Sequence, residues 1–540
     1  MESKRLCGLA WVVILAMLAA PALADDADTR AELGRILAQA EQDPGALRLG
    51  DSAAARRFYT ARGGGPAWRE GESWSPQATA AVAVLQAAGR EGLNPRDYVA
   101  PEVPTLPPFP SAAQAARIDF LLSAGLLRYI GDVRAGRVVP SEINPYFAVY
   151  PPRPDAAAAL TQALGAPDFD AWVGTLPPPD SAYARLRDAL AAYREIAAGG
   201  PWPELPAGPT LKLGAIGPEI AVLRRQLSLL GDLHQSPTVT ENEFDTELDA
   251  AARRFQSRNG IASDGAVGAA TRAALAVTPQ QHAEAIALNL ERLRWFARPA
   301  SGRYAVINTA GFELTAYGDG KIAAKMPVIV GKARMSTPVF PDEITALTFM
   351  PTWTVPPSIA RKEILPKIRK DPNYLAKENM KVYSGWNDAA CEVDPLDVDW
   401  KSMRAGALQH RFVQQPGPSN ALGRLRFTLH NEFGIFLHDT PAKKLFRTPV
   451  RTYSHGCIRV GDAAALAEFV LNGDPDWPPA AIDAAMNGTE TKRIDLARPL
   501  HIEVVYLTAW VDDDGIVQFR SDTYGRDPPL AIALGLAQMP

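Results

Sequence analysis

The chain lacks an excess of positive charge and, after its first residues, any long apolar run. Its formal net charge is −4, so the composition does not indicate a nucleic-acid partner. No segment beyond the N-terminus is long and apolar enough to cross a bilayer. Hydrophobic residues make up 47% and charged residues 21% of the chain, which is typical of soluble globular domains. At 540 residues, the chain is too long to fold around a single core.

The first residues have the features of a secretory signal peptide. Lys4 and Arg5 form a basic start, an apolar stretch follows, and Ala22-Leu23-Ala24 fits the small-x-small cleavage rule. We therefore predict that residues 1–24 are removed and that the protein is exported to the periplasm. An uncleaved N-terminal anchor is the alternative, although the apolar stretch is short for a membrane span.

Cysteine is also scarce, with three residues in the whole chain. Cys7 lies within the predicted signal peptide, so the mature protein keeps Cys391 and Cys457. Exported proteins usually pair their cysteines, and a Cys391–Cys457 disulfide is one alternative. That disulfide would leave the two histidines near Cys457 without a role. We expect two free thiols instead.

Helical spacing of apolar residues dominates the first half of the chain. Around Val82 and Leu122, apolar side chains recur three and four positions apart, which predicts helices. Residues 25–205 contain no cluster of reactive side chains, so we interpret them as a structural helical domain. Residues 211–277 form a compact unit, in which three amphipathic stretches separated by turns predict a small helical bundle.

From about residue 300 the apolar period changes to that of strands. Alternating segments predict a β-rich domain over 300–520, with Asp319-Gly320 as a hairpin turn. Residues 354–424 interrupt it with lysine-rich sequence that we interpret as helical. An insertion of this size, placed before the reactive residues, is interpreted as a cap over the site.

Two short motifs near the C-terminus concentrate the reactive side chains. His438 closes a predicted strand and precedes Asp439-Thr440-Pro441, and residues 454–460 read S-H-G-C-I-R-V. A thiolate is the strongest side-chain nucleophile near neutral pH and needs a neighbouring base, so Cys457 is the candidate nucleophile. A predicted helix after Asp462 places Cys457 at a strand-to-helix junction, where the helix dipole stabilises a thiolate.

The residues around the cysteine suggest further roles. Gly456 allows close approach of the backbone, and the N–H groups of Gly456 and Cys457 are candidate oxyanion donors. Arg459 is expected to hold a substrate carboxylate or to fix the loop by an ion pair. The other candidate substrate-binding residues are Tyr453 and Trp353.

Three alternatives to a catalytic cysteine with two histidines stay open. His438, Asp439, His455 and Cys457 are possible zinc ligands, although their spacing matches no standard zinc site. Cys457 is otherwise a buried, inert thiol, which leaves the glycine and both histidines unexplained. In the third alternative, which we favour, His438 alone is the base and His455 is structural.

The order H-D-T-P followed by S-H-G-C-I-R-V resembles the L,D-transpeptidase family with its YkuD-type catalytic domain. Residues 353–359 (W-T-V-P-P-S-I), 362–366 (K-E-I-L-P) and 371–375 resemble its large YcbB-type branch. Residues 91–98 and 128–138 look like the helical scaffold of that branch, and 211–277 resembles a three-helix peptidoglycan-binding module. The resemblance implies a multidomain α+β protein with a helical N-terminal scaffold, a peptidoglycan-binding bundle and a β-rich catalytic domain with an inserted helical cap.

The resemblance also implies a mechanism. Cys457 attacks the carbonyl at the L-centre of diaminopimelate in a donor tetrapeptide stem, D-Ala leaves, and His438 shuttles the protons. The Asp439 carbonyl orients the imidazole. An amine of a second stem resolves the thioester into a 3–3 crosslink, without a metal or organic cofactor. Acylation by carbapenems and contacts with other wall synthases are further expectations.

Two other functions compete with crosslinking. A thiol endopeptidase or carboxypeptidase would use the same residues with water as the acceptor. A non-catalytic scaffold would only bind the wall. The cap and the wall-binding module suit a polymeric acceptor, and this favours the transferase.

Overall fold

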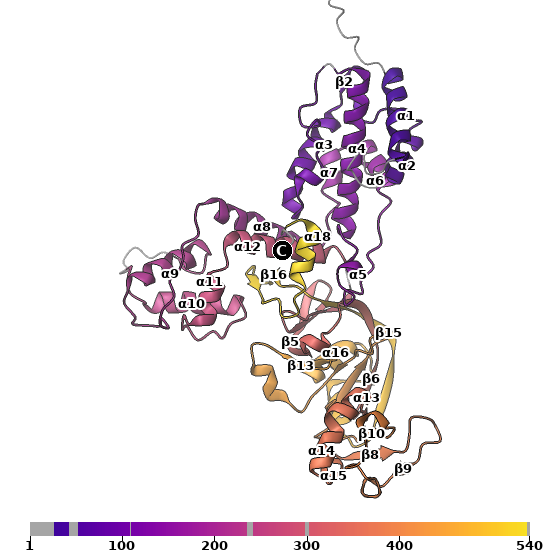
Figure 1. Cartoon of the computed structure of the whole chain (residues 1–540), viewed down its shortest axis with the longest axis vertical. Coiled ribbons are helices and arrows are strands. Elements are labelled where there is room, and N and C mark those ends of the chain that lie inside the picture. Colours follow the sequence, from indigo (N-terminus) through magenta and orange to yellow (C-terminus); the bar gives the residue numbers. More distant parts are fainter. Residues whose placement is uncertain (1–25, 43–51, 109, 235–240, 297–301, 537–540) are drawn as a thin grey trace, which may run out of the picture. The chain divides into compact units, whose positions relative to one another are not determined.

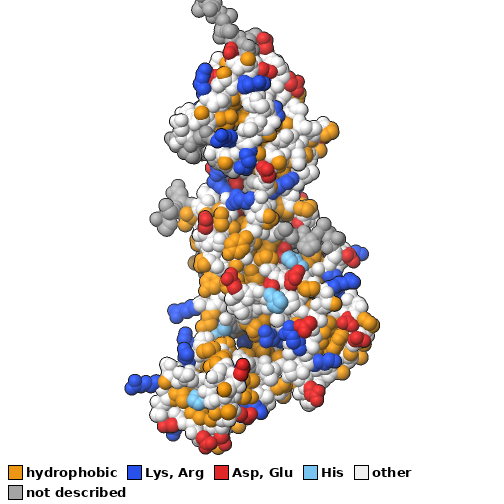
Figure 2. All heavy atoms as spheres, turned by 90° about the vertical axis from the view of Figure 1, so that its right-hand side faces the viewer, with side chains coloured by type: hydrophobic (Ala, Val, Ile, Leu, Met, Phe, Trp, Pro, Cys, Tyr) orange, Lys and Arg blue, Asp and Glu red, His pale blue; other side chains and the backbone are white. Residues whose placement is uncertain are grey.

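The computed structural model describes residues 26–42, 52–108, 110–234, 241–296 and 302–536. The predicted signal peptide lies outside these residues. The described chain divides into two compact units, one of residues up to 89 with 93–131 and 154–176, the other of 90–92, 132–153 and 177 onward. No helix in the described segments has the length and apolar character needed to span a membrane. On the face shown in Figure 2, acidic and basic side chains are interspersed.

The first unit is helical, as expected. Its elements are α1 (Asp26–Gln42), α2 (Ser52–Ala61), β1 (Arg69–Glu70), β2 (Ser73–Trp74), α3 (Pro76–Gln86), α4 (Ala112–Ala135), α6 (Ala156–Gly165) and α7 (Phe169–Val173). A buried carboxylate on α4 ties a loop to the core. Asp119 accepts hydrogen bonds from Tyr59 Oη at 2.7 Å and from the amides of Ala67 and Trp68. A buried carboxylate needs such donors, because an unpaired one would be costly.

The second unit begins with helices. These are α5 (Pro140–Ile143), α8 (Ser181–Ala198), α9 (Pro218–Leu229), α10 (Thr246–Arg258), α11 (Ala269–Leu275) and α12 (Pro279–Leu293). Asp245 caps α10 by accepting from the Leu248 amide, and a capping box of Thr278 and Gln281 starts α12. The predicted bundle of residues 211–277 contains α9, α10 and α11, whose apolar faces meet around Leu223, Leu248 and Phe255.

A nine-stranded sheet forms the catalytic part of the second unit (Figure 1). Its order is β13-β5-β14-β12-β11-β6-β15-β3-β4, and β4 also pairs with β5, so the sheet closes on itself. The strands are β3 (Arg303–Asn308), β4 (Glu313–Gly318), β5 (Lys321–Gly331), β6 (Phe340–Phe349), β11 (Leu425–Thr428), β12 (Leu437–His438), β13 (Thr452–Ser454), β14 (Ile458–Val460) and β15 (Lys492–Val505).

Two helices cover the apolar side of this sheet. Leu466 and Val470 of α16 (Ala463–Val470) and Ile482 of α17 (Pro479–Met486) join the same buried core as Val328, Leu437 and other strand residues. Beyond them, the chain adds the pair β16 (Ala509–Val511) and β17 (Val517–Phe519) and the helix α18 (Asp527–Leu534). The β-rich domain predicted over 300–520 includes β15, β16 and β17, but none of these strands was predicted individually.

The inserted cap is not purely helical, so that prediction is wrong in part. It contains α13 (Pro357–Ile359), a π-helical turn (Ala360–Ile364), α14 (Leu365–Lys370) and α15 (Tyr374–Lys377), beside a sheet ordered β7-β10-β8-β9. The strands are β7 (Trp353–Thr354), β8 (Met380–Tyr383), β9 (Glu392–Val393) and β10 (Arg411–Gln414). Alternate burial of Met380 and Val382 about exposed Lys381 shows the strand period, which lysine content obscures.

We predict opposite effects of alanine at two glycines of α4. A Cβ at Gly125 would overlap the Tyr98 carbonyl oxygen and lie 2.9 Å from Leu85 Cδ1, whereas one at Gly131 meets nothing within 4 Å. Gly125→Ala should lower the free energy of unfolding by about 1–3 kcal/mol. The matched control Gly131→Ala should raise it by about 0.5–1 kcal/mol, since alanine favours helix. Chemical denaturation measures both, and equal effects would contradict this packing.

Candidate active site

The cysteine motif and the histidine motif meet through parallel strand pairing. β12 and β14 pair in parallel, with Leu437 opposite Ile458 and His438 opposite Arg459. The Ile458 amide donates to the Phe436 carbonyl at 3.1 Å. This bond places Cys457 beside Phe436, just before the two strands begin to pair. β14 separates Cys457 from α16, so the predicted strand-to-helix junction is wrong. Ile458 and Val460 are fully buried, and their burial in the sheet extends the chain there.

His438 stands between two arginines in one row of the sheet. Antiparallel pairing of β11 with β12 places Arg426 opposite His438, and parallel pairing with β14 places Arg459 on the other side. Residues directly opposite one another in adjacent strands share a face. The three side chains therefore lie on the same face of the sheet.

The His438 imidazole is held in one tautomer. Its Nδ1 lies 2.6 Å from the Asp439 carbonyl oxygen, and a carbonyl only accepts, so Nδ1 carries the proton. Nε2 is then the nitrogen available to take a proton. His438 is 4% exposed. Burial, followed by the Arg459 cation, lowers the pKa of His438 to about 3, and the imidazole is neutral at ordinary pH.

The Asp439 side chain braces the turn that carries this carbonyl. One carboxylate oxygen accepts from the Arg424 amide at 3.0 Å, and the other pairs with Lys443 Nζ at 2.6 Å. Gly423 has φ +64, and a Cβ there would lie 2.6 Å from the Asp439 Cβ. Asp439 thus serves the site through its backbone carbonyl, while its carboxylate holds the local fold.

Cys457 is a protonated thiol in this setting. Burial raises its pKa above the ordinary value, against the lowering effects of the Phe436 backbone, Arg426 and Arg459. The thiol donates toward the Gly434 carbonyl, with 3.8 Å between Sγ and oxygen. Thiol and imidazole are therefore both neutral, and the pair needs a proton transfer to become reactive.

The loop before the cysteine is tightly bonded. Gly456 has φ +120, a conformation that favours glycine. Its amide donates to Ser454 Oγ at 3.1 Å, and Ser454 Oγ donates to the Cys457 carbonyl at 2.6 Å. Of the two oxyanion donors that the sequence suggests, the Gly456 amide is already engaged. This leaves the Cys457 amide as the remaining candidate.

His455 contacts the cap. Its Nε2 lies 2.6 Å from Glu363 Oε1 in the π-helical turn. The cap therefore contacts residues 454–457, which we call the cysteine loop. Tyr453, at 37% exposure, lies on β13, and Trp353 lies on β7 and packs partly against the cap core. Cys391 and Cys457 are both free thiols. Within the described segments, no three histidine, cysteine or acidic side chains are grouped to hold a metal ion, so the zinc alternative has no ligand arrangement.

Three family models match the chain. One described as "Scaffold domain" matches residues 53–190, and one described as "Putative peptidoglycan binding domain" matches 216–275. The model of the L,D-transpeptidase catalytic domain matches residues 302–478, which include both His438 and Cys457. The chain carries an L,D-transpeptidase catalytic domain. The YcbB-like branch is consistent with its combination of scaffold, wall-binding and L,D-transpeptidase domains.

A protein named "Putative L,D-transpeptidase" from Haemophilus influenzae is 30% identical over 251 residues, covering 46% of this chain and 49% of that protein. The chain thus spans about half the length of this curated relative. Solved L,D-transpeptidases resemble it weakly. That of Xylanimonas cellulosilytica is 15% identical with a TM-score of 0.18, covering 55% of this chain and 98% of the other. That of Stackebrandtia nassauensis is 14% identical with a TM-score of 0.20, covering 55% and 97%.

Sequence reasoning missed three residues that the structure places beside His438, His455 and Gly456. Arg426 lies in a predicted strand, but its place beside His438 depends on strand register. Glu363 lies 92 residues before its partner His455. Thr337, fully buried, donates to the Gly456 carbonyl at 2.8 Å. Glu363 falls in the segment 362–366 that carries part of the family resemblance, but the local sequence assigns none of the three a role beside Cys457 or His438.

We predict an unusual pH dependence of Cys457 alkylation. In a Cys391→Ser background, the rate with iodoacetamide should rise through the alkaline range, because the raised thiol pKa keeps the sulfur protonated at lower pH. No inflection should occur near about pH 6.5, the ordinary histidine value, because His438 stays neutral down to about 3. Mass spectrometry of the intact protein measures the rate. A reactive plateau below neutral pH would reveal a thiolate–imidazolium pair instead.

Proposed function

We propose that the chain is a peptidoglycan L,D-transpeptidase that forms 3–3 crosslinks between stem peptides through a thioester on Cys457. One observation carries this proposal: a neutral His438, tied at Nδ1 to the Asp439 carbonyl, ends β12, and Cys457 directly precedes β14, the parallel neighbour of β12. That arrangement supplies a nucleophile and an unprotonated nitrogen next to the same pair of strands, β12 and β14. The L,D-transpeptidase domain match supports the choice of reaction.

In the first step, the Cys457 sulfur bonds to the diaminopimelate carbonyl carbon of the donor tetrapeptide. His438 Nε2 takes the thiol proton, and the carbonyl oxygen becomes an oxyanion. Collapse of this intermediate breaks the bond to D-Ala, whose amine receives the proton from His438. In the second step, the side-chain amine of another stem attacks the thioester. His438 accepts the amine proton and returns it to the leaving sulfur, so the enzyme is regenerated.

Substrate carboxylates have matching cations on the same face. Arg426 and Arg459 flank His438, and Nε of each is buried without a hydrogen-bond partner among the described residues. Burial lowers the pKa of each guanidinium, whereas the Cys457 thiolate would raise it. A carboxylate of the stem would satisfy these donors in a charge-assisted, bidentate geometry. We therefore assign Arg426 and Arg459 to donor binding.

The remaining parts suit a polymeric substrate. The match to a peptidoglycan-binding domain supports association with the cell wall, where tetrapeptide stems serve as donor and acceptor. The contact of Glu363 with His455 supports a cap that closes on the bound stem, together with Tyr453 and Trp353 as candidate contacts. We propose that the protein is exported to the periplasm, that carbapenems acylate Cys457, and that other wall synthases act beside it.

The function is tested with a purified disaccharide-tetrapeptide and mass spectrometry. We expect a covalent adduct on Cys457 and a crosslinked dimer that has lost one D-Ala. Cys457→Ala should abolish both, and His438→Ala should slow the adduct by about 10²–10⁴-fold, since it removes the proton carrier. A shortened monomer in place of the dimer would identify a hydrolase. Unchanged substrate with wild-type protein would favour the non-catalytic scaffold.

A second experiment tests the arginine assignment. Arg426→Gln should raise KM for the tetrapeptide roughly 10-fold or more, because a hydrogen bond to a charged group is lost. Arg426→Lys should recover part of the loss. The matched control is Arg117→Gln on α4, because Arg117 is exposed and already pairs with Glu102 at 2.9 Å. Equal KM changes in Arg426→Gln and Arg117→Gln would contradict a specific role for Arg426.

A further inference from the structure

The Gly456 carbonyl is held by a side chain far away in the sequence. Thr337 is fully buried, and its hydroxyl donates to the Gly456 carbonyl at 2.8 Å while accepting from the Gly331 amide at 3.0 Å. A planar trans peptide points its C=O and N–H in opposite directions. Fixing the Gly456 carbonyl therefore fixes the direction of the Cys457 N–H, which belongs to the same peptide and is the remaining candidate oxyanion donor.

The segment 331–337, which we name the brace, is packed against the cysteine loop. A Cβ at Gly331 would overlap the Met335 carbonyl and lie 3.1 Å from Gly456 Cα. The Lys332 amide donates to the Ser454 carbonyl at 3.0 Å. Backbone atoms of the brace and the loop thus meet directly, with no side chain to absorb movement. A displacement of the brace would move the loop with it.

The brace is held in turn by the C-terminal segment. Arg526 Nη2 donates to the Thr337 carbonyl at 2.9 Å and to Ser336 Oγ at 3.2 Å. Tyr524 Oη donates to the Gly331 carbonyl at 2.7 Å. These bonds join both ends of the brace to residues that follow the matched catalytic segment 302–478. The cysteine loop is therefore supported, through the brace, by a part of the chain outside that segment.

Arg526 is buried in the protein interior rather than exposed on its surface. Its side chain is 1% exposed, and the guanidinium lies over the rings of Tyr146, Phe147, Tyr506 and Tyr524, at 4.7–5.8 Å from their centroids. Cation–π contacts and carbonyl acceptors offset the cost of burying this charge. A lysine would keep the charge but not the planar fork of donors.

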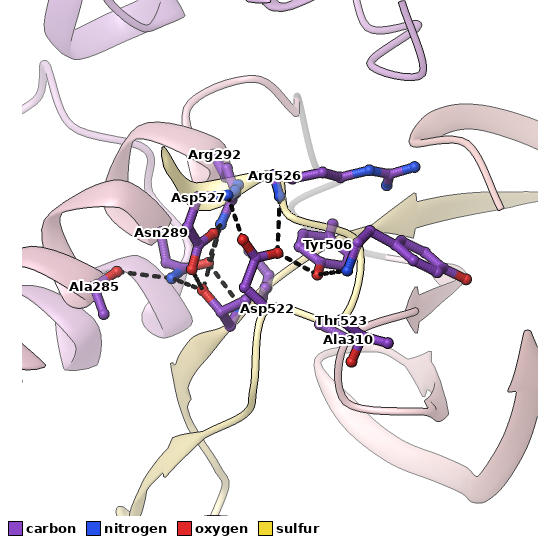
Figure 3. Close-up of polar contacts among 12 residues, drawn as sticks. Ala285, Asn289, Arg292, Ala310, Tyr506, Asp522, Thr523, Arg526 and Asp527 are labelled. Atoms are coloured by element: carbon purple, nitrogen blue, oxygen red, sulfur yellow. Dashed lines mark hydrogen bonds and ion pairs between the residues drawn. The ribbon is translucent and has the colours of Figure 1, made fainter. Parts of the chain in front are cut away.

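A single carboxylate sets the backbone of the arginine (Figure 3). Asp522 accepts from the amides of Arg526 at 2.9 Å and Asp527 at 2.8 Å, and from Tyr506 Oη at 2.6 Å. Asp527 then pairs with Arg292 of α12 at 2.6 Å. Three donors on one carboxylate determine the turn from which the Arg526 side chain extends, and the ion pair ties that turn to a long helix.

We propose that Arg526 is a positioning residue for acyl transfer, which acts through the Thr337 carbonyl to hold the Gly456–Cys457 peptide and its oxyanion-binding N–H. Arg526 touches no reacting atom. The identity of the acyl donor in this inference rests on the proposed function. The positioning itself applies to any electrophile whose carbonyl oxygen becomes an oxyanion on attack by Cys457.

The test compares two electrophiles on Cys457 in a Cys391→Ser background. A carbapenem is attacked at its lactam carbonyl: the sulfur–carbon bond forms, the carbon–nitrogen bond breaks, and the nitrogen receives the proton, so the reaction uses the oxyanion donor. Iodoacetamide alkylation forms no oxyanion and reports only thiol access and ionisation. The quantity measured is the ratio of the two rates, by mass spectrometry of the intact protein.

Arg526→Met should lower this ratio about 10- to 100-fold, the loss typical of a small misplacement of catalytic groups. Arg526→Lys should recover part of it. Thr337→Val removes the hydroxyl that bonds the Gly456 carbonyl and should lower the ratio by a similar factor. Thr337→Ser keeps a hydroxyl and should restore the ratio. The matched control is Arg520→Met, since Arg520 bonds the carbonyls of Arg258 and Phe519, away from the brace.

Other outcomes separate the two proposals. An unchanged ratio in folded Arg526→Met or Thr337→Val overturns the positioning role, and so does a parallel loss of both rates, which indicates general disruption. If the ratio falls but wild-type protein forms no adduct with the tetrapeptide, the positioning role stands and the proposed substrate fails. A wild-type protein that the carbapenem does not acylate overturns both.

Discussion

The hydrogen bond from the Ile458 amide to the Phe436 carbonyl marks the strand pairing on which the site depends. It belongs to the parallel ladder of β12 and β14, which sets Cys457 two positions before Arg459, the residue opposite His438. The register also aligns Arg426, His438 and Arg459 in one row. A shift by one residue would turn every side chain of the shifted strand to the other face of the sheet. Buried Leu437, Ile458 and Val460 oppose such a shift, because it would expose them.

Under the proposed function, the row of Arg426, His438 and Arg459 would respond to a bound substrate carboxylate. Arg459 and Arg426 both lower the pKa of His438, and both favour the thiolate of Cys457. A carboxylate that binds the two arginines would neutralise this effect. The proton affinity of the imidazole would then rise while the stem is bound, and His438 would become a better acceptor for the thiol proton. The basicity of His438 would thereby depend on whether a carboxylate is bound to the two arginines.

Local patterns predicted much of the architecture, and long-range register escaped them. The helices of residues 211–277 and the strand ending at His438 follow from apolar spacing. β15 alternates apolar residues twice, at Ile494 and Leu496 and again at Leu500, Ile502 and Val504, but Pro499 and the bulge between Asp495 and Leu500 interrupt the period. The cluster of His438 and Cys457 was visible as a motif. The roles argued for Arg426 and Thr337 depend on which strands and loops become neighbours, and no local pattern encodes this.

The position of β15 shows that the sheet carrying His438 extends beyond the matched segment 302–478. β15 lies between β6 and β3, pairing antiparallel with the first and parallel with the second. Without it, β6 and β3 would present unpaired edges and the buried row of Ile502 and Val504 would be missing from the core. Residues 302–478 are therefore not sufficient to complete the sheet. The chain must continue through β15, and beyond it Tyr524 and Arg526 bond to the brace, the segment that packs against the cysteine loop.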